Sequence, residues 1–156
     1  AFSISLSIDK ALKKSAKKPY LKIIATDVSD KALSKAKVGV YSDVELTRGM
    51  PNSLKNEHFK GVRDGWQIAS SHRSRVTFGR LNLLKDFSNL GQFDIVFCRN
   101  VLMSFAVSAK TDILNRITSV MKQGAYLFLS SSEILPAEIK NLEVIRNADC
   151  KCYRKI

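Results

Sequence analysis

The sequence contains no Gly-x-Gly pair among its seven glycines. This absence excludes the phosphate-cradling loops of dinucleotide-binding and P-loop proteins from the printed residues. The three cysteines form no Cys-x-x-Cys pair, and the two histidines lie far apart. A disulfide framework and a metal site are therefore disfavoured, and we expect a reducing, cytoplasmic environment. No apolar run approaches the length of a membrane span, and the opening "AFSISLSI" lacks the length and the basic leader of a signal peptide.

Acidic residues are scarce. The sequence has 14 Asp and Glu but 26 Lys and Arg, which gives a formal net charge of +12. This balance implies an acidic partner: nucleic acid, a membrane surface or an acidic protein. A coat of solvated lysines on the outer faces of helices is the alternative explanation. The length of 156 residues, with 45% hydrophobic residues, predicts one soluble globular domain with a sizeable core.

The first half of the chain begins with apolar residues at helical spacing: Ile4, Ile8, Ala11 and Leu12. No capping residue precedes this helix, so we expect that upstream residues are missing. The stretch "YLKIIATD" then predicts a buried strand ending at Asp27, and Ser29 is suited to cap a short helix that ends at Gly39. From about 43 to 75 the pattern loosens around glycines and a proline, which predicts a small inserted β-subdomain.

Regular patterns return in the second half of the chain. The stretches "RVTFGRLNLL" and "FDIVFCRN" predict two strands, and "AYLFLSSSE" predicts a further central strand. A helix capped by Ser108 and closed by Gly124 is expected to carry one apolar face: Ile113, Leu114, Ile117, Val120 and Met121. Residues 141–156 predict an antiparallel hairpin with a turn at Asn147, Ala148 and Asp149.

Strands that alternate with helices indicate a parallel sheet covered on both faces, and such sheets bind ligands beyond the carboxyl ends of their strands. Five residues end three of the predicted strands, and we expect them to converge on one crevice: Asp27, Asn82, Leu83, Arg99 and Asn100. An acidic residue in the position of Asp27 commonly binds ribose hydroxyls. An Asp after a strand also serves as a helix cap or a turn former.

Successive blocks of the chain resemble the CheR-type chemotaxis receptor methyltransferases: "ATDVSDKALSKAKVGVYS", "ELTRGMP", "VTFGRLNLL", "FDIVFCRNVLMSF" and "LFLSSSEIL". The blocks occur in order over nearly the whole chain, and "FCRNV" after a strand is a specific signature. The resemblance implies an α/β, Rossmann-like class I methyltransferase sheet, mostly parallel, with a C-terminal antiparallel hairpin and the inserted β-subdomain at about 43–75. Residues 1–156 would be this domain as a fragment, without the family's N-terminal helical domain, first strand and Gly-rich loop.

The resemblance also implies roles for the residues at the strand ends. Asp27 would bind the ribose hydroxyls of the cofactor S-adenosylmethionine (SAM), whose product is S-adenosylhomocysteine, and Asn82 and Leu83 would border the adenine. Arg99 and Asn100 would lie where the cofactor meets the acceptor. Without the resemblance, Asn82 is a strand-end turn residue and Leu83 a core residue. A surface ion pair is the alternative for Arg99, but its apolar neighbours predict a guanidinium emerging from buried surroundings, where a charge needs a partner.

Members of the family esterify glutamates on the helical cytoplasmic domains of chemoreceptors, so the expected partner is an acidic receptor domain in the cytoplasm. A glutamate side chain has a reference pKa of about 4.3 and is already ionised near neutral pH, so no general base is required. The absence of an obvious Ser–His or Cys–His constellation agrees with this, and Cys98 is interpreted as strand core. Arg99 is the expected catalytic residue, because its planar fork would hold one carboxylate oxygen while the other attacks.

Two positions depart from the family's pattern. Ser104 occupies a position where members commonly carry an aromatic residue, usually Tyr, and Ser131 one where Gly or His is frequent. Altered substrate choice, reduced activity and a non-catalytic SAM-binding signalling module are therefore alternatives. A nucleic-acid methyltransferase would suit the basic charge. Such enzymes usually carry an Asp/Asn-Pro-Pro-aromatic block where this chain has "CRNV", without proline, which disfavours them.

Some family members dock the receptor's C-terminal peptide on the β-subdomain by adding a strand. These members share a Gly-containing extension of one loop. The stretch "HFKGVRDGWQIASSHRSRV" is compact and has no evident extension. The sequence therefore predicts an enzyme that works independently of such a tether.

Overall fold

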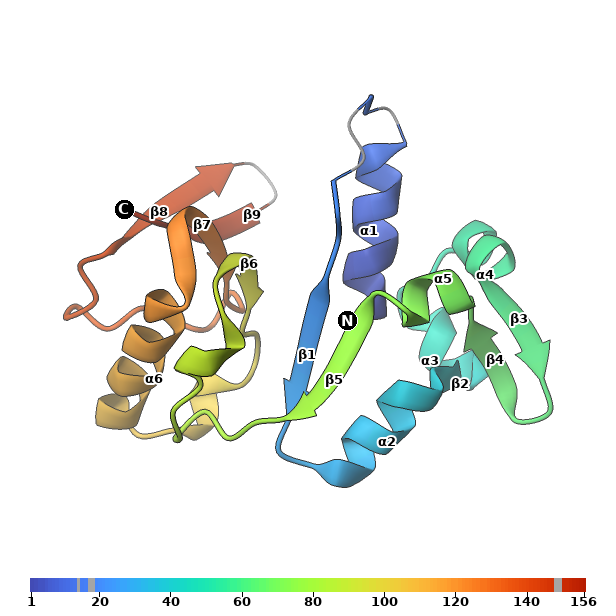
Figure 1. Cartoon of the computed structure of the whole chain (residues 1–156), viewed down its shortest axis with the longest axis horizontal. Helices are drawn as coiled ribbons and strands as arrows, with labels where there is room; N and C mark the ends of the chain where they lie inside the picture. The colour runs from blue at the N-terminus through green and yellow to red at the C-terminus, as the bar shows by residue number, and fades with distance from the viewer. Residues whose placement is uncertain (14, 17–18, 148–149) are drawn as a thin grey trace. The chain divides into compact units, whose positions relative to one another are not determined.

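The computed structural model describes residues 1–13, 15–16, 19–147 and 150–156. The chain forms two compact units, Ala1–Asn82 and Leu83–Ile156 (Figure 1). Within the described ranges, no helix has both the length and the apolar character that crossing a membrane requires. The predicted organisation as a single domain over residues 1–156 stays a prediction.

The first unit contains a parallel pair of strands, β1 (Ile23–Asp27) and β5 (Val76–Arg80). Asp27 pairs with Arg80 in this register, so the carboxyl ends of the two strands lie at the same edge. Both strands were predicted, and β1 begins three residues later than the stretch "YLKIIATD".

Helix α2 (Asp30–Val38) begins and ends where the sequence predicts. The Ser29 hydroxyl accepts a hydrogen bond from the N–H of Ala32 and so caps the helix N-terminus. Gly39 follows the helix with a φ of 66°, the left-handed conformation of a C-terminal cap. A Cβ added to Gly39 would lie 2.9 Å from Cγ2 of Ile68, so this position needs glycine for space as well as for conformation.

A small antiparallel sheet follows α2, with its strands in the order β2–β4–β3. Its elements are β2 (Val40–Tyr41), α3 (Asp43–Thr47), α4 (Asn52–His58), β3 (Phe59–Val62), β4 (Gly65–Ile68) and α5 (Ser70–Arg73). Only Arg63 and Asp64 connect β3 to β4. Gly65 has a φ of 137°, and a Cβ there would lie 2.4 Å from the carbonyl oxygen of Tyr41. The sheet overlaps the range of about 43–75 predicted for an inserted β-subdomain, and it also includes residues 40–41.

Helix α1 (Phe2–Leu12) buries a different face from the predicted one. The predicted stripe was Ile4, Ile8, Ala11 and Leu12, whereas the buried residues are Phe2, Ser5 and Leu6. Phe2 and Leu6 belong to a core cluster with Leu46, Phe59, Ile68 and Val76. The prediction was wrong because it followed apolar side chains alone, while the hydroxyl of Ser5 finds a buried partner in His72.

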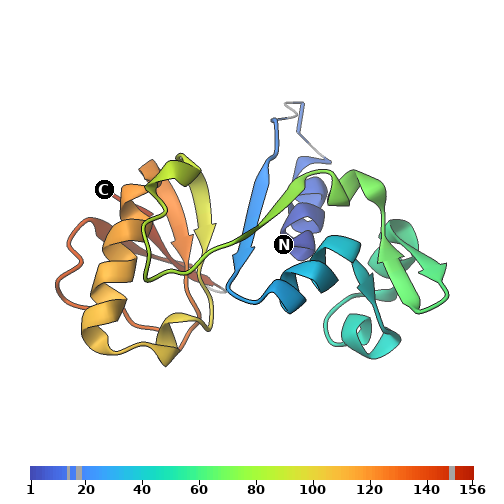
Figure 2. The ribbon, with the colours of Figure 1, turned by 60° about the horizontal axis from the view of Figure 1, so that its bottom comes forward.

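The second unit contains a four-stranded sheet in the order β6–β7–β9–β8. Its elements are η1 (Ser88–Leu90), β6 (Phe93–Phe97), η2 (Leu102–Ser104), α6 (Val107–Ser119), β7 (Met121–Phe128), β8 (Leu142–Asn147) and β9 (Cys150–Lys155). The parallel pair β6–β7 and the antiparallel pair β8–β9 confirm the α/β fold class with a C-terminal hairpin. Helix α6 lies beside this sheet (Figure 2). Residues 148–149 of the predicted hairpin turn lie outside the described residues.

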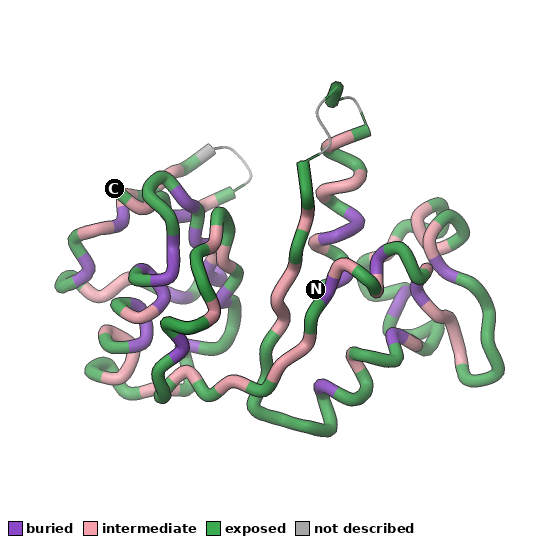
Figure 3. Tube along the Cα trace, viewed as in Figure 1, coloured by how far each residue is buried: buried purple, intermediate pink, exposed green. Residues whose placement is uncertain are grey.

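Both predicted boundaries of α6 are wrong, although its buried face is confirmed. The helix begins after Ala106 without a side-chain cap, and Ser108 lies inside its first turn. It ends at Ser119, and Gly124 lies within β7 with a φ of 76°. Buried positions recur along α6 (Figure 3), and they include the predicted Ile113, Leu114 and Ile117.

Candidate functional site

The candidate residues lie at the carboxyl ends of strands, as the sequence predicts. Asp27 is the last residue of β1, and Asn82 follows β5. Arg99 and Asn100 follow β6. Asp27 and Asn82 belong to the first unit and Leu83, Arg99 and Asn100 to the second, so the convergence of all five on one crevice stays a prediction.

Asp27 is exposed, and its carboxylate is only partly occupied. Oδ1 accepts the N–H of Ser29 at 2.8 Å, and the Asp27 carbonyl accepts the N–H of Leu81 at 3.0 Å. The first contact is that of a turn former, one of the two alternatives for this residue. Oδ2 has no hydrogen-bond partner among the residues that the structure describes. One carboxylate oxygen is thus available to accept a hydroxyl hydrogen from a ligand.

The backbone carbonyl of Leu83 accepts a hydrogen bond from a helix, a contact that the sequence did not predict. Nη1 of Arg116, on α6, donates to the Leu83 carbonyl at 3.2 Å. The Leu83 side chain is half-buried, and the neighbouring Asn82 is exposed. No local pattern predicts this contact, because 33 positions separate Arg116 from Leu83.

Cys98 is a strand-end core residue, as interpreted from the sequence. Its side chain is buried, and its N–H donates to the Phe128 carbonyl at 2.9 Å. Burial, with a further effect of the Glu133 carboxylate, raises the pKa of the Cys98 thiol to about 11. The thiol therefore stays protonated near neutral pH and is a poor nucleophile.

Arg99 is exposed, and it forms no hydrogen bond or ion pair with any other residue in the described ranges. Two apolar residues of the preceding strand are also exposed to solvent, since Ile95 and Phe97 are 47% and 46% exposed. The prediction of buried surroundings is wrong within this unit, because β6 is an outer strand of the four-stranded sheet. The alternative of a surface ion pair is not observed among the described residues either. The guanidinium donors are therefore available to an anionic ligand.

The turn after β6 is held by Glu133, which the sequence analysis did not single out. Oε1 of Glu133 accepts the N–H groups of Val101 and Leu102 at 3.1 and 2.8 Å. Oε2 accepts the N–H of Asn100 at 3.0 Å, and the N–H and hydroxyl of Ser130 at 2.9 and 2.8 Å. Burial alone raises the pKa of Glu133, but these hydrogen bonds outweigh it and lower the pKa below its ordinary value. An acidic residue three serines after the apolar stretch "AYLFL" was the signal available in the sequence.

Ser104 turns its side chain back onto its own turn. Its hydroxyl donates to the Val101 carbonyl at 2.8 Å, at the end of η2. The side chain is exposed, as is that of Ser131. Ser104 therefore offers neither the size nor the ring face of the aromatic residue that the family commonly carries there.

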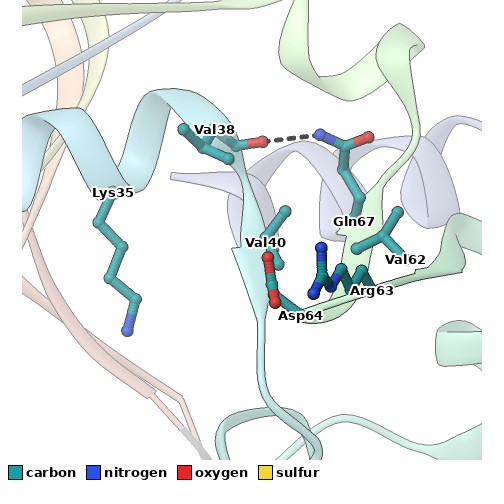
Figure 4. A pocket seen from close by; sticks show the side chains of 7 residues that line it. All are labelled: Lys35, Val38, Val40, Val62, Arg63, Asp64 and Gln67. Atoms are coloured by element: carbon teal, nitrogen blue, oxygen red, sulfur yellow. Dashed lines mark hydrogen bonds between the residues drawn. The ribbon is translucent and has the colours of Figure 1, made fainter.

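A cavity of about 470 Å³ lies in the first unit. Its lining comes from α2, β2 and the β3–β4 hairpin (Figure 4): Lys35, Val38, Val40, Val62, Arg63, Asp64 and Gln67. The Gln67 side chain donates to the Val38 carbonyl at 3.1 Å across this lining. None of the five candidate residues contributes to it.

The structure also contains a Ser–His pair that the sequence analysis missed. The Ser5 hydroxyl lies 2.8 Å from Nδ1 of His72, and the two residues are 0% and 2% exposed. A pair without solvent access cannot meet a substrate, so it supports the fold and not the chemistry. It was missed because 67 positions separate its members.

Residues 1–151 match the family described as "CheR methyltransferase, SAM binding domain". The chain is 42% identical to "Chemotaxis protein methyltransferase 1" of Pseudomonas aeruginosa over 137 residues, covering 86% of this chain and 50% of the relative. Identity and coverage are the same for "Chemotaxis protein methyltransferase Cher2" of Pseudomonas putida, at 42%, 86% and 50%. The chain is 33% identical to "Chemotaxis protein methyltransferase" of Vibrio parahaemolyticus, covering 93% of this chain and 54% of the relative. It spans about half the length of the curated relatives it matches.

Proposed function

The chain belongs to the CheR methyltransferase family, whose SAM-binding domain matches residues 1–151, and from this premise we propose that it methylates glutamate side chains of chemoreceptors. The match over nearly the whole chain is the observation that carries the reaction class. The printed names of its relatives, chemotaxis protein methyltransferases, support chemotaxis as the process. The site of action would be the cytoplasmic helices of the receptor.

The residues at the strand ends suit SAM, the cofactor of this domain family. Asp27 offers an exposed carboxylate oxygen without a partner in the described part of the chain, which fits a ribose hydroxyl. Asn82 and Leu83 would border the adenine, and Asn100 would lie beside the cofactor. When bound, SAM supplies a methyl group activated by a sulfonium.

Arg99 is the residue proposed to receive the acceptor. Its exposed guanidinium has no competing partner in the described ranges, and its planar fork suits one oxygen of a carboxylate. The acceptor glutamate is ionised near neutral pH, so the chain has to orient it and exclude water, without removing a proton. The protonated Cys98 thiol and the enclosed Ser5–His72 pair agree with a reaction that uses no base from this chain.

The charge of the chain supports an acidic receptor as the partner. Residues 1–82 carry 16 Lys and Arg against 7 Asp and Glu, a net charge of +9. Residues 83–156 carry 10 against 7, a net charge of +3. A concentrated positive charge accelerates encounter with an acidic surface, and the acceleration decreases as salt is added.

Transfer of a tritiated methyl group from SAM to a receptor cytoplasmic fragment tests this proposal. The full-length natural protein should label the fragment with an alkali-labile methyl ester, and a fragment whose acceptor glutamates are replaced by alanine should stay unlabelled. Binding of SAM without any transfer would favour the non-catalytic signalling module. Ser104, in place of the family's usual aromatic residue, is the feature that suggests this alternative. Alkali-stable label in RNA or DNA would favour a nucleic-acid methyltransferase.

A further inference from the structure

The turn that follows β6 directs three consecutive backbone N–H groups toward one carboxylate. Asn100 has a φ of 60°, and no other non-glycine residue in the described ranges has a positive φ. Val101 returns to the right-handed region, with φ −111° and ψ −47°. A left-handed residue followed by a right-handed one turns successive N–H groups toward the same point, which makes a small anion-binding concavity. The anion bound there is the chain's own Glu133.

The Glu133 carboxylate ties together the carboxyl ends of two parallel strands. Three of its five donors belong to the turn after β6, and the other two belong to Ser130, just beyond the end of β7. The side chain is only 5% exposed. At this depth a charge is stable only when its partners are in place, and the loss of the carboxylate would leave the backbone donors unsatisfied.

We propose that Glu133 is a positioning residue for methyl transfer, which sets the direction in which Arg99 and Asn100 project from the end of β6. This inference rests on the proposed function, because it takes Arg99 as the group that holds the acceptor. Glu133 does not touch the substrate, since both of its oxygens are occupied by donors of this chain. It acts by fixing the backbone of residues 100–102. A displacement of about 1 Å in a positioned group can lower a rate by about 100-fold.

Glu133→Gln is the informative substitution. An amide keeps the size of the side chain but offers one acceptor oxygen, and its NH2 group faces the same N–H donors. At saturating SAM, we expect kcat/KM for the receptor fragment to fall by about 10- to 100-fold. Glu133→Asp keeps the charge on a shorter stem and should recover part of the loss. Glu138→Gln, which changes an exposed carboxylate of the same segment, is the matched control and should keep the parental rate.

A double-mutant cycle with Arg99 separates positioning from general stability. If Glu133 acts through Arg99, Glu133→Gln should lower the rate of an Arg99→Ala enzyme by less than about threefold. A purely structural role would lower the rate by the same factor in both backgrounds, and this result would overturn the inference. Parental activity of a folded Glu133→Gln enzyme would overturn it as well. Thermal melts identify the folded variants, and Glu133→Asp carries the cycle if the Gln variant does not fold.

The amide NMR signals of residues 100–102 give a readout that does not depend on activity. Glu133→Gln should shift these three signals together, whereas Glu138→Gln should leave them in place. Unchanged signals would show that the Glu133 carboxylate does not hold the backbone of residues 100–102, even if the enzyme is active. If Glu133→Gln shifts these signals but the parent methylates no receptor glutamate, Glu133 does hold the backbone of residues 100–102, and only the proposed function is contradicted.

Discussion

Nε2 of His72 lies 3.1 Å from Nδ1 of His58, and the two rings meet edge to face with their centroids 4.9 Å apart. Nδ1 on the other side of His72 faces the Ser5 hydroxyl. Beside this chain of contacts, Arg75 donates to the Asp9 carboxylate at 2.6 Å. These polar contacts join α1, α4 and α5 inside the first unit, so its stability depends on the protonation state of a buried ring.

The first prediction is that acid destabilises this unit through His72. Burial is the main cause that lowers the pKa of His72 below its ordinary value of 6.5. Arg75, and His58 when it is protonated, lower it further against the opposing effect of Asp9. The unfolded chain therefore binds the proton more readily than the folded chain. The stability that neutral His72 contributes is complete above about pH 6.5 and is lost as the pH falls below that value.

Thermal melts at about pH 7.5 and about pH 5.5 measure this dependence. The melting temperature of the parent should fall more on acidification than that of His72→Asn, which keeps a polar side chain but does not titrate. Equal falls in both proteins would remove His72 from the explanation.

The second prediction concerns the ribose hydroxyls. Asp27→Ala should weaken SAM binding by roughly 1.5–3 kcal/mol, the range for a hydrogen bond to a charged group. Asp27→Asn keeps an acceptor for the Ser29 N–H and isolates the effect of the charge. Asp30→Asn is the matched control, because Asp30 is exposed and its carboxylate pairs with Arg80. Calorimetry that finds the parental affinity in Asp27→Ala would exclude Asp27 from the site.

The third prediction separates the two reasons for an asparagine at position 100. Its φ of 60° favours Asn or Gly over other residues. Asn100→Gly keeps this conformation and removes the amide, so it should melt near the parental temperature but bind SAM more weakly. Asn100→Ala should also lose about 1–2 kcal/mol of stability. If Asn100→Gly binds SAM with parental affinity, the residue serves the backbone alone.

The fourth prediction is that the proposed methylation of a receptor needs no receptor tether. The β3–β4 hairpin closes through Arg63 and Asp64 alone, which agrees with the compact stretch from which independence of a tether was predicted. Methylation of a receptor fragment should therefore proceed at a similar rate after its C-terminal peptide is deleted. Loss of binding in a pull-down with the shortened receptor would contradict this prediction and direct attention to the cavity beside Arg63.

Local sequence signals predicted the features whose causes are local. Ser29 and Gly39 bound α2 through contacts within three or four residues, so their chemistry is legible in the sequence. The strands of both parallel pairs were predicted for the same reason, since apolar runs between turn residues identify them.

Features that depend on distant partners could not be predicted in this way. Lys155 on β9 contacts the end of α6, since its Nζ donates to the carbonyl of Thr118 at 2.7 Å and, beyond the helix, to that of Met121 at 2.8 Å. From local signals alone, the sequence predicted that the helix ends at Gly124. Glycine commonly ends helices, but this one lies within β7. The hydrogen bond from the Asn100 N–H to Glu133 could not be predicted for a similar reason, because the two residues are 33 positions apart.

Single-turnover methyl transfer by Arg99 variants tests the central claim most directly. Arg99→Ala should stay folded and transfer methyl groups to the receptor fragment more slowly by about 100-fold or more, since a group that positions and stabilises reacting charge is lost. Arg99→Lys should restore only part of the rate, because a point charge does not reproduce the planar fork. Arg146→Ala, at an exposed arginine of the same unit, should match the parent. A folded Arg99→Ala enzyme that transfers methyl groups at the parental rate would contradict the role of Arg99 at the end of β6.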